Sequence, residues 1–294
     1  MSQKQSNNLI EPLVSIGLFV RNGASCIHEV LDSLIGQTYK HFELIISDNA
    51  STDDTQAICE AYAKKDPRVR YIRQKEDIGR LQNADFVRHE ARGEYYMLAC
   101  HDDLYDKRYI EKCLEKFKED PSAIGVFSRY RVENFAGTRD IDPSRSYASQ
   151  KGLYERLKAF TQFHSADGKL DTIFSLWKAE VLTDIADEST QYSDLNWLFK
   201  QLFLGRLLQV DEALFTRREI SRPEGYGYEY VRKLPRAKRF KRFFTDRIIA
   251  AMGNYSRLHA SYILNSPALT GVEKTKLLFW ELLSYLRGIW TGHY

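Results

Sequence analysis

Short hydrophobic runs and helical hydrophobic patterns alternate through the first half of this chain. A strand that is buried on both faces gives a near-continuous apolar run, so each run rich in β-formers predicts a buried strand. Such runs lie at 14–20, 42–47 and 94–100, and the stretches 69–73 and 123–132 predict two further strands. Hydrophobic residues recur at helical spacing between them, at about 26–37, 53–65, 80–92 and 107–118. This order predicts a mostly parallel, Rossmann-like α/β sheet with helices on both faces.

The second half of the chain changes in character along its length. Residues 134–150 are polar and predict a mobile loop. Helical patterns follow at 151–163, 176–186 and 195–204, and the run 207–215 predicts a strand that closes the domain. From residue 225 onward the pattern is helical, first basic and then aromatic, so we expect a helical C-terminal extension.

Charge is unevenly distributed along the 294 residues. The formal net charge is +3, but residues 232–247 contain eight Lys/Arg and one Asp and so carry +7, which leaves about −4 (3 − 7) for the remainder. A basic segment with interleaved aromatic residues is typical of a membrane-surface contact. The alternative is a helix that packs on the main domain or on a second copy of the chain. We expect no nucleic-acid partner, because this segment lies outside the predicted sheet.

The N-terminal residues and the spacing of the cysteines are typical of an intracellular protein. Residues 1–11 are polar and predict a disordered tail without a signal core. We therefore expect a cytoplasmic protein, with possible peripheral contact to the inner face of the plasma membrane. The four cysteines form no C-x-x-C pair, so we expect free thiols in the core rather than zinc ligands or disulfides.

Carboxylates mark the ends of several predicted elements. Asp48 follows the second strand, Asp102 and Asp103 follow the fourth, and Asp194 precedes an apolar helix. The carboxyl ends of parallel strands meet at one edge of a sheet, where open α/β folds bind ligands. Adjacent carboxylates repel each other unless a cation or ligand hydroxyls hold them. On local sequence alone, a solvated turn at Asp102–Asp103 and helix caps at Asp48 and Asp194 are equally acceptable.

Several common nucleotide and hydrolase motifs are absent from the sequence. No G-x-G-x-x-G follows the first strand, and no G-x-x-x-x-G-K-[ST] is present, which excludes a dinucleotide fingerprint and a P-loop. The G-x-S-x-G elbow of α/β-hydrolases is missing as well. The candidate site is therefore marked by acids rather than by glycines.

Three segments resemble family 2 glycosyltransferases of the GT-A fold. They are PLVSIGLFVRNGASCIHEVLDSLIGQTYKHFELIISDNASTDDT, ARGEYYMLACHDD and YSDLNWLFKQLFLGRLLQVDEALFTRRE. The resemblance covers about residues 12–220 and implies a catalytic domain at 12–222 with a C-terminal extension at 223–294. Within the domain it implies a nucleotide-sugar half at about 12–133 and an acceptor half at about 134–222.

The resemblance also implies a reaction and a set of site residues. It implies an inverting, metal-dependent transfer from a UDP-, GDP- or dTDP-sugar to a glycan or lipid-linked acceptor, in bacterial surface polysaccharide synthesis. Asp194 would be the catalytic base, Asp103 would bind Mg²⁺ or Mn²⁺, and Asp102 would hold the ribose and assist the metal. The expected nucleotide-sugar contacts are Phe19, Val20, Arg21, Asn22, Asp48, Asn49, Arg80 and Asp102.

The chain departs from the family pattern at three positions. The first acid of a full D-x-D motif would fall at Cys100 or His101, an aromatic residue is replaced by Arg21, and an Asn is replaced by Asp85. A second hypothesis is that the protein has the same fold but no transfer activity, and serves as a nucleotide-sugar-binding assembly protein. A homodimer through the C-terminal extension remains a further expectation.

Overall fold

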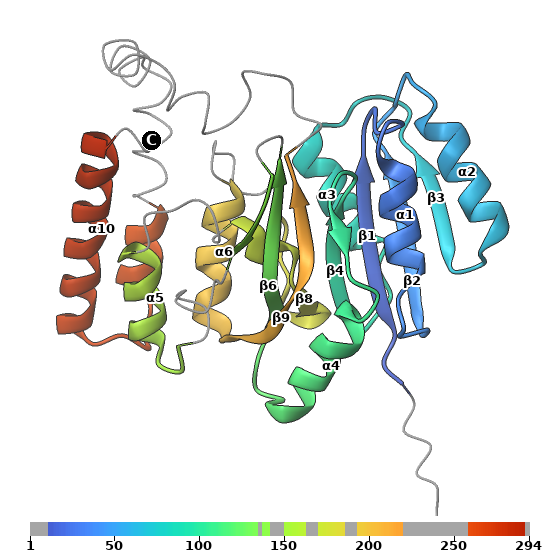
Figure 1. Ribbon diagram of the computed structural model, residues 1–294. Coiled ribbons are helices and arrows are strands. Elements are labelled where there is room, and N and C mark those ends of the chain that lie inside the picture. The colour runs from blue at the N-terminus through green and yellow to red at the C-terminus, as the bar shows by residue number, and fades with distance from the viewer. Residues whose placement is uncertain are drawn as a thin grey trace, which may run out of the picture.

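The computed structural model describes residues 11–134, 137–141, 150–162, 170–185, 193–219 and 258–291 (Figure 1). Its strands are β1 (Val14–Val20), β2 (Phe42–Asp48), β3 (Val69–Arg73), β4 (Tyr95–Cys100), β5 (Leu104–Tyr105), β6 (Gly125–Asn134), β7 (Gly137–Ile141), β8 (Leu176–Lys178) and β9 (Leu207–Arg218). Its longer helices are α1 (Ile27–Ile35), α2 (Thr55–Lys65), α3 (Arg80–His89), α4 (Tyr109–Glu119), α5 (Leu153–Gln162), α6 (Ser193–Leu204) and α10 (Gly271–Thr291). Short 3₁₀ turns, η3 (Leu170–Phe174) and η4 (Ala179–Val181), flank β8.

One twisted sheet organises the described part of the chain, with the strand order β3-β2-β1-β4-β8-β6-β9-β5 and with β7 paired to β6. β1, β2, β3 and β4 pair in parallel, and β6 is parallel to β9. The short strand β8 lies antiparallel between β4 and β6. Three residue pairs join β8 to β4 and two join it to β6. The mostly parallel sheet expected from the sequence is therefore confirmed.

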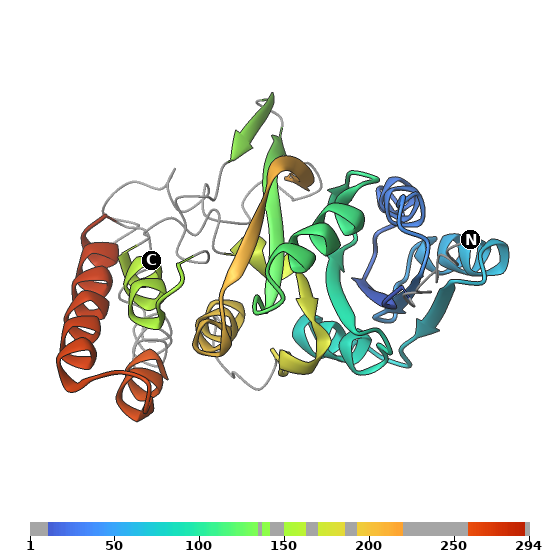
Figure 2. The same ribbon diagram turned by 90° about the horizontal axis from the view of Figure 1, so that it is seen from below.

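Helices cover both faces of the sheet, and each face has its own hydrophobic core. Figure 2 shows α1 and α4 on one side and α3 and α6 on the other. The first core joins β1 and β2 to α1, through fully buried residues such as Leu18 and Leu31. The second joins β4 to α3 and α6, through residues such as Val87 and Phe199. Each fully buried aliphatic or aromatic side chain of this size contributes roughly 1.5–3 kcal/mol by leaving water.

Two of the predicted elements are wrong in detail. The helix expected at 176–186 is instead β8 followed by a single 3₁₀ turn, because Leu176 and Trp177 fill a gap in the sheet between β4 and β6. The loop expected at 134–150 contains β7, which extends β6 as a hairpin. Apolar residues in a short run fit a strand or a helix equally well, so periodicity alone did not separate them.

The C-terminal extension is helical where the structure describes it. Residues 258–265 form a helix, and α10 follows and lies against α5 (Figure 1). Within the described ranges, no helix is long and apolar enough to cross a membrane. The basic segment 232–247 and residues 1–10 of the predicted tail lie outside the described residues.

Candidate functional site

The predicted site residues gather at the carboxyl edge of β1, β2 and β4. In the parallel register, Val20 lies opposite Asp48 of β2, and Phe19 lies opposite Cys100 of β4. Asp102 and Asp103 follow β4 in the turn that leads to β5. Neighbouring strands are about 4.8 Å apart, so residues from the ends of β2 and β4 lie about 10 Å from one another across β1. Asp48 and the Asp102–Asp103 pair therefore lie at one edge of the sheet, as expected from the sequence.

Asp48 is fully buried and accepts hydrogen bonds from three donors of the protein itself. Its Oδ2 accepts bonds from the Tyr71 hydroxyl and from Nη1 of Arg73, both at 2.8 Å, and its Oδ1 accepts one from the backbone N–H of Ser51, at 2.8 Å. Burial, followed by this hydrogen bond, raises the pKa of the Tyr71 hydroxyl, which therefore remains a donor. Asp48 thus fixes the end of β2 and holds Arg73 at the same edge of the sheet.

The turn after β1 is tied to the turn after β2. The backbone N–H of Asn22 donates to Oγ of Ser51 at 2.9 Å, and Oδ1 of Asn22 accepts a bond from the N–H of Thr52 at 2.8 Å. Asn22 and Ala50 both have positive φ, 53° and 55°, a conformation that non-glycine residues adopt rarely and usually at functional turns. The helix-capping alternative for Asp48 is wrong, because α2 begins only after Asp54 and has no side-chain cap.

Asp77 links two of the predicted nucleotide-binding positions, Arg21 and Asn49. It forms an ion pair with Arg21, and its Oδ1 accepts bonds from Nδ2 of Asn49 at 2.6 Å and from the N–H of Gly79 at 2.9 Å. The Gly79 N–H, opposed by desolvation and assisted by Arg21, lowers the pKa of Asp77. Arg80, the first residue of α3, is exposed directly after this loop.

Asp102 and Asp103 are held by the last residue of β9. The backbone N–H of Arg218 donates to Oδ1 of Asp103 at 3.0 Å, and Nε of Arg218 donates to the backbone oxygen of Asp102 at 2.5 Å. The guanidinium of Arg218 also pairs with Glu29 of α1. Asp103 is buried, whereas Asp102 is partly exposed. The turn is therefore fixed from two elements that are remote from it in sequence.

The residues at this turn fit a divalent cation. Sγ of Cys100 and carboxylate oxygens of Asp102 and Asp103 all lie within 4.8 Å of one another. Carboxylate oxygens bind divalent cations at about 2.0–2.6 Å, so one ion can contact two atoms that lie about 4–5 Å apart. The two predicted metal ligands therefore lie together, and the sulfur of Cys100 lies with them.

The expected catalytic base belongs to α6. Asp194 is the second residue of this helix, but its side chain lies outside what the structure describes. β9 runs parallel to β6 and follows α6 directly, so the first turn of α6 lies toward the same sheet edge as Asp102. A negative charge in the first turn of a helix is favoured by the helix dipole.

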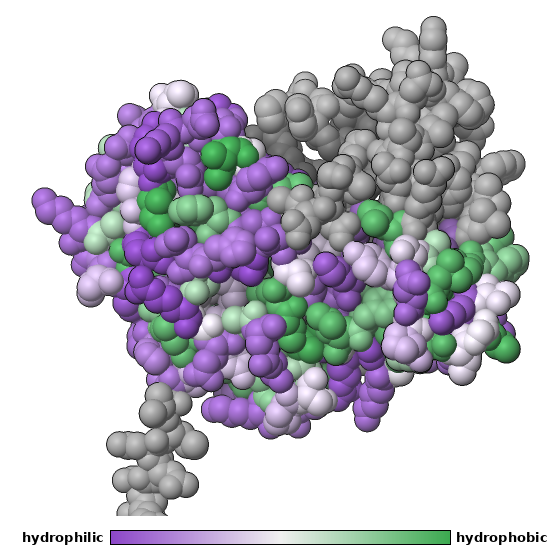
Figure 3. Space-filling view, turned by 180° about the vertical axis from the view of Figure 1, so that it is seen from behind, coloured by the Kyte–Doolittle hydropathy of each residue, from purple (hydrophilic) through white to green (hydrophobic). Residues whose placement is uncertain are grey.

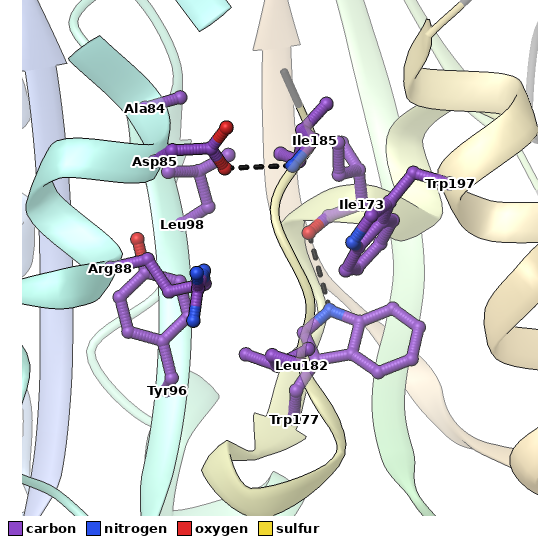
Figure 4. Close-up of a pocket in the computed structure, with 10 residues that line it drawn as sticks. All are labelled: Ala84, Asp85, Arg88, Tyr96, Leu98, Ile173, Trp177, Leu182, Ile185 and Trp197. Atoms are coloured by element: carbon purple, nitrogen blue, oxygen red, sulfur yellow. Dashed lines mark hydrogen bonds between the residues drawn. The ribbon is translucent and has the colours of Figure 1, made fainter. Parts of the chain in front are cut away.

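α3 supports the segment that leads to α6. Oδ1 of Asp85 accepts a 2.8 Å bond from the N–H of Ile185, and Arg88 pairs with Asp184 (Figure 4). Nε1 of Trp197 in α6 donates to the backbone oxygen of Thr183 at 2.8 Å. The Asp at position 85 therefore accepts a backbone hydrogen bond, which an Asn side-chain oxygen would do equally well.

A small cavity lies between α3, β4 and α6 (Figure 4). Its volume of about 10 Å³ holds roughly one water molecule, which excludes it as a sugar site. The Tyr96 hydroxyl faces it and has no hydrogen-bond partner among the described residues. Burial raises the pKa of Tyr96, so the hydroxyl stays protonated.

The expectation of four core thiols is only partly correct. Cys59 and Cys113 are buried, and burial raises the pKa of Cys59 to about 12. Cys26 and Cys100 are partly exposed at the edge of the sheet. Sequence reasoning also missed Arg73, Asp77 and Arg218 as parts of the site. In the sequence, these residues stand out only by their position at the end of a strand or in a loop. That position does not reveal the order of the strands in the sheet.

The comparisons with known proteins agree with this architecture. Residues 15–175, more than half of the chain, match the family described as Glycosyl transferase family 2. A crystal structure of S. aureus TarS residues 1–349 in complex with UDP-GlcNAc superposes with a TM-score of 0.65 at 17% identity, over 93% of this chain and 72% of that chain. The fold is therefore of the GT-A type, and the chain belongs to glycosyl transferase family 2.

The curated relatives are glycosyltransferases of bacteria. Glycosyltransferase GlyG of Streptococcus pneumoniae serotype 4 is 27% identical over 125 residues, which are 42% of this chain and 42% of the relative. The putative teichuronic acid biosynthesis glycosyltransferase TuaG of Bacillus subtilis is 31% identical over 128 residues, 44% of this chain and 50% of the relative. The chain thus spans half or less of the length of these relatives.

Proposed function

We propose that this protein transfers a sugar from a nucleotide-diphosphate sugar to a hydroxyl of a glycan or lipid-linked acceptor, with inversion at the anomeric carbon. The observation that carries the proposal is the position of Asp102 and Asp103 after the end of β4, at the same sheet edge as Asp48, which ends β2 on the other side of β1. We assign donor binding to residues 12–133 and acceptor binding to residues 134–222. The names of TuaG and other relatives support a role in surface polysaccharide synthesis.

The residues of the crevice have distinct tasks in this reaction. The backbone at Phe19 and Val20, together with Asn22, Asp48 and Asn49, would form the walls of the base pocket. Arg21 and Arg80 are exposed at its mouth, where their positive charge would attract a diphosphate. The carboxylate of Asp102 would accept hydrogen bonds from the ribose hydroxyls.

Asp194 would act as the general base. Its carboxylate would take the proton from the acceptor hydroxyl as that oxygen forms a bond to the anomeric carbon. The bond from this carbon to the diphosphate oxygen breaks with its electron pair on the leaving group. Attack from the face opposite the leaving group inverts the configuration.

A divalent cation, Mg²⁺ or Mn²⁺, would be held by Asp103 with Asp102. When bound, it supplies positive charge that stabilises the negative charge of the departing nucleoside diphosphate. Arg218 keeps both residues of the turn in place through its backbone N–H and its Nε.

The test is thermal-shift binding of UDP, GDP and dTDP, each with and without Mn²⁺. A ligand that binds only the native state raises its stability, so one nucleotide should raise the Tm and the shift should need the metal. The shift should disappear in Asp103→Ala but remain in Asp54→Ala, a matched exposed carboxylate outside the crevice. A folded protein that shows no shift with any nucleotide would contradict the proposal.

A donor-hydrolysis assay separates this function from that of an assembly protein. Many transferases slowly pass the donor sugar to water, which needs the same leaving-group stabilisation. Release of nucleoside diphosphate from the matching sugar nucleotide, lost in Asp103→Ala, indicates a transferase. Binding without any release, even with acceptor extracts, would favour the nucleotide-sugar-binding assembly protein.

α10 presents a surface that favours peripheral contact with an anionic membrane. Val272, Phe279 and Leu283 are exposed large apolar residues at helical spacing on one face, and the exposed Lys276 lies between them. Hydrophobic residues also gather at this edge of the molecule in the view from behind (Figure 3). The sequence adds a charge of +7 at residues 232–247, which matches anionic lipid headgroups.

Vesicle flotation tests the membrane contact. The protein should float with anionic vesicles but not with neutral ones, and Phe279→Ser should weaken flotation whereas Thr275→Ser should not. If the protein instead forms a dimer by light scattering that Phe279→Ser dissociates, this face is a contact between two copies and the membrane proposal is wrong.

A further inference from the structure

Cys100 occupies the last position of β4, at the point where the strand opens into the candidate metal site. It is partly exposed and lies opposite Phe19 of β1, at the ligand-facing edge of the sheet. Its Sγ belongs to the group of ligand atoms, with Asp102 and Asp103, that all lie within 4.8 Å of one another. A thiol was not expected there, since the D-x-D pattern has an acid before Asp102.

The distances permit one ion to contact the sulfur and both carboxylates. Metal–sulfur bonds are about 2.3 Å long for zinc, and metal–oxygen bonds about 2.0–2.2 Å. Two atoms bound to one ion are therefore separated by about 4.5 Å at most, close to the limit of 4.8 Å found here. The group is therefore close to the size that three ligands of one shared ion require.

The second thiol of the region is engaged elsewhere. Sγ of Cys26 donates to the backbone oxygen of His101 at 3.3 Å, and the backbone oxygen of Gly23, at 3.6 Å, is an alternative acceptor for the same S–H. Burial raises the pKa of Cys26, which disfavours the thiolate that a metal needs. Cys26 therefore serves as a natural control for Cys100.

We propose that Cys100 is a direct ligand of the divalent cation, so that the site has one sulfur and two carboxylate ligands. Thiolate ligands favour Zn²⁺, Co²⁺ and, to a lesser degree, Mn²⁺ over Mg²⁺, which prefers oxygen. Cys100 would lose its proton to the solvent when the cation binds. The inference rests on the proposed metal-assisted function and changes the expected cation from either Mg²⁺ or Mn²⁺ to a thiophilic transition metal.

Titration of the full-length protein with Co²⁺ tests the inference directly. A cobalt–thiolate bond gives a sulfur-to-metal charge-transfer band in the near ultraviolet, which oxygen ligands do not give. The titration is made with CoCl₂ alone and again with UDP or GDP present, and calorimetry measures binding in parallel. The variants are Cys100→Ser, Cys26→Ser and Cys100→Asp, each checked for folding by circular dichroism.

The band should appear in the natural protein and in Cys26→Ser, and it should vanish in Cys100→Ser. Cys100→Asp completes an oxygen-only site, so the preference for Co²⁺ over Mg²⁺ should fall by about tenfold or more. Co²⁺ binding without the band, or a band that persists in Cys100→Ser, would overturn the role of Cys100 and leave the metal proposal intact. Absence of calorimetric binding under all conditions would overturn both.

Discussion

The backbone N–H of Arg218, at the end of β9, donates a 3.0 Å hydrogen bond to Oδ1 of Asp103, 115 positions earlier in the chain. Nε of the same residue donates to the backbone oxygen of Asp102. The carboxylate pair is therefore shaped by the second half of the molecule, although it follows a strand of the first half. Because the bond to Asp103 comes from the backbone N–H, a change such as Arg218→Ala leaves that donor in place, and the side-chain contribution can be measured separately.

Arg218→Ala should lower both stability and donor binding. The change removes the hydrogen bond from Nε to the Asp102 oxygen and the ion pair with Glu29, at a cost of about 1–3 kcal/mol in the free energy of unfolding. The control is Glu29→Gln, because Glu29 is mostly exposed and such pairs contribute only about 0–1 kcal/mol. Urea unfolding and nucleotide thermal shifts measure the two effects, and equal losses in both variants would contradict the positioning role.

Asp48→Ala should be strongly destabilising even without any ligand. It leaves the Tyr71 hydroxyl, Nη1 of Arg73 and the Ser51 N–H without their acceptor, which costs roughly 2–4 kcal/mol in total. Tyr71→Phe removes a single bond and should cost about 0.5–1.5 kcal/mol while nucleotide binding is retained. Urea unfolding gives the ranking. If Tyr71→Phe abolishes nucleotide binding as fully as Asp48→Ala does, the base contact belongs to Tyr71.

The loop around Asp77 should make stability depend on acid pH. The pKa of Asp77 is lowered below its ordinary value of 3.8, so its stabilising contribution is complete above pH 3.8 and is lost as pH falls through the lowered pKa. Asp77→Asn should remove this part of the pH dependence, and Asp54→Asn should not. Unfolding measured between about pH 2 and pH 6 tests the difference, and identical curves for the natural protein and Asp77→Asn would refute it.

Gly17 and Tyr96 should be energetically coupled across β1 and β4. A Cβ at Gly17 would overlap the Tyr96 hydroxyl oxygen and lie 2.9 Å from Cγ2 of Val87, so Gly17→Ala should cost about 1–3 kcal/mol. Tyr96→Phe removes a hydroxyl that has no partner among the described residues and should be neutral or stabilising. In the double variant, Tyr96→Phe should recover part of the stability that Gly17→Ala removes. Strict additivity of the two changes in a double-mutant cycle would contradict the overlap.

The part of the fold that the sequence predicted well is the part with long-range regularity. β1, β2 and β4 are near-continuous apolar runs with helices between them, and right-handed crossovers leave few ways to arrange such units. β8 has three residues and is flanked by turns, so its pattern contained too few positions to distinguish a strand from a helix.

The candidate site was predictable to the extent that its residues follow strands directly. Asp48 and Asp103 could be placed at one edge from topology alone. The hydrogen-bond partners of these two carboxylates could not be predicted. Arg73 and Arg218 reach the site from β3 and β9, and the residues that they contact depend on the order of the strands in the sheet. Cys100 was placed correctly on its strand, but a core role was expected because a lone cysteine carries no spacing signal.

The narrow antiparallel strand β8 has a consequence for how this enzyme family can diversify. The stretch that matches the family ends at residue 175, immediately before β8 begins at Leu176. Only a few residue pairs join β8 to β4 and β6. A descendant gene that exchanged the segment beyond this junction would therefore also replace β9, and it would have to restore the bonds by which Arg218 holds Asp102 and Asp103.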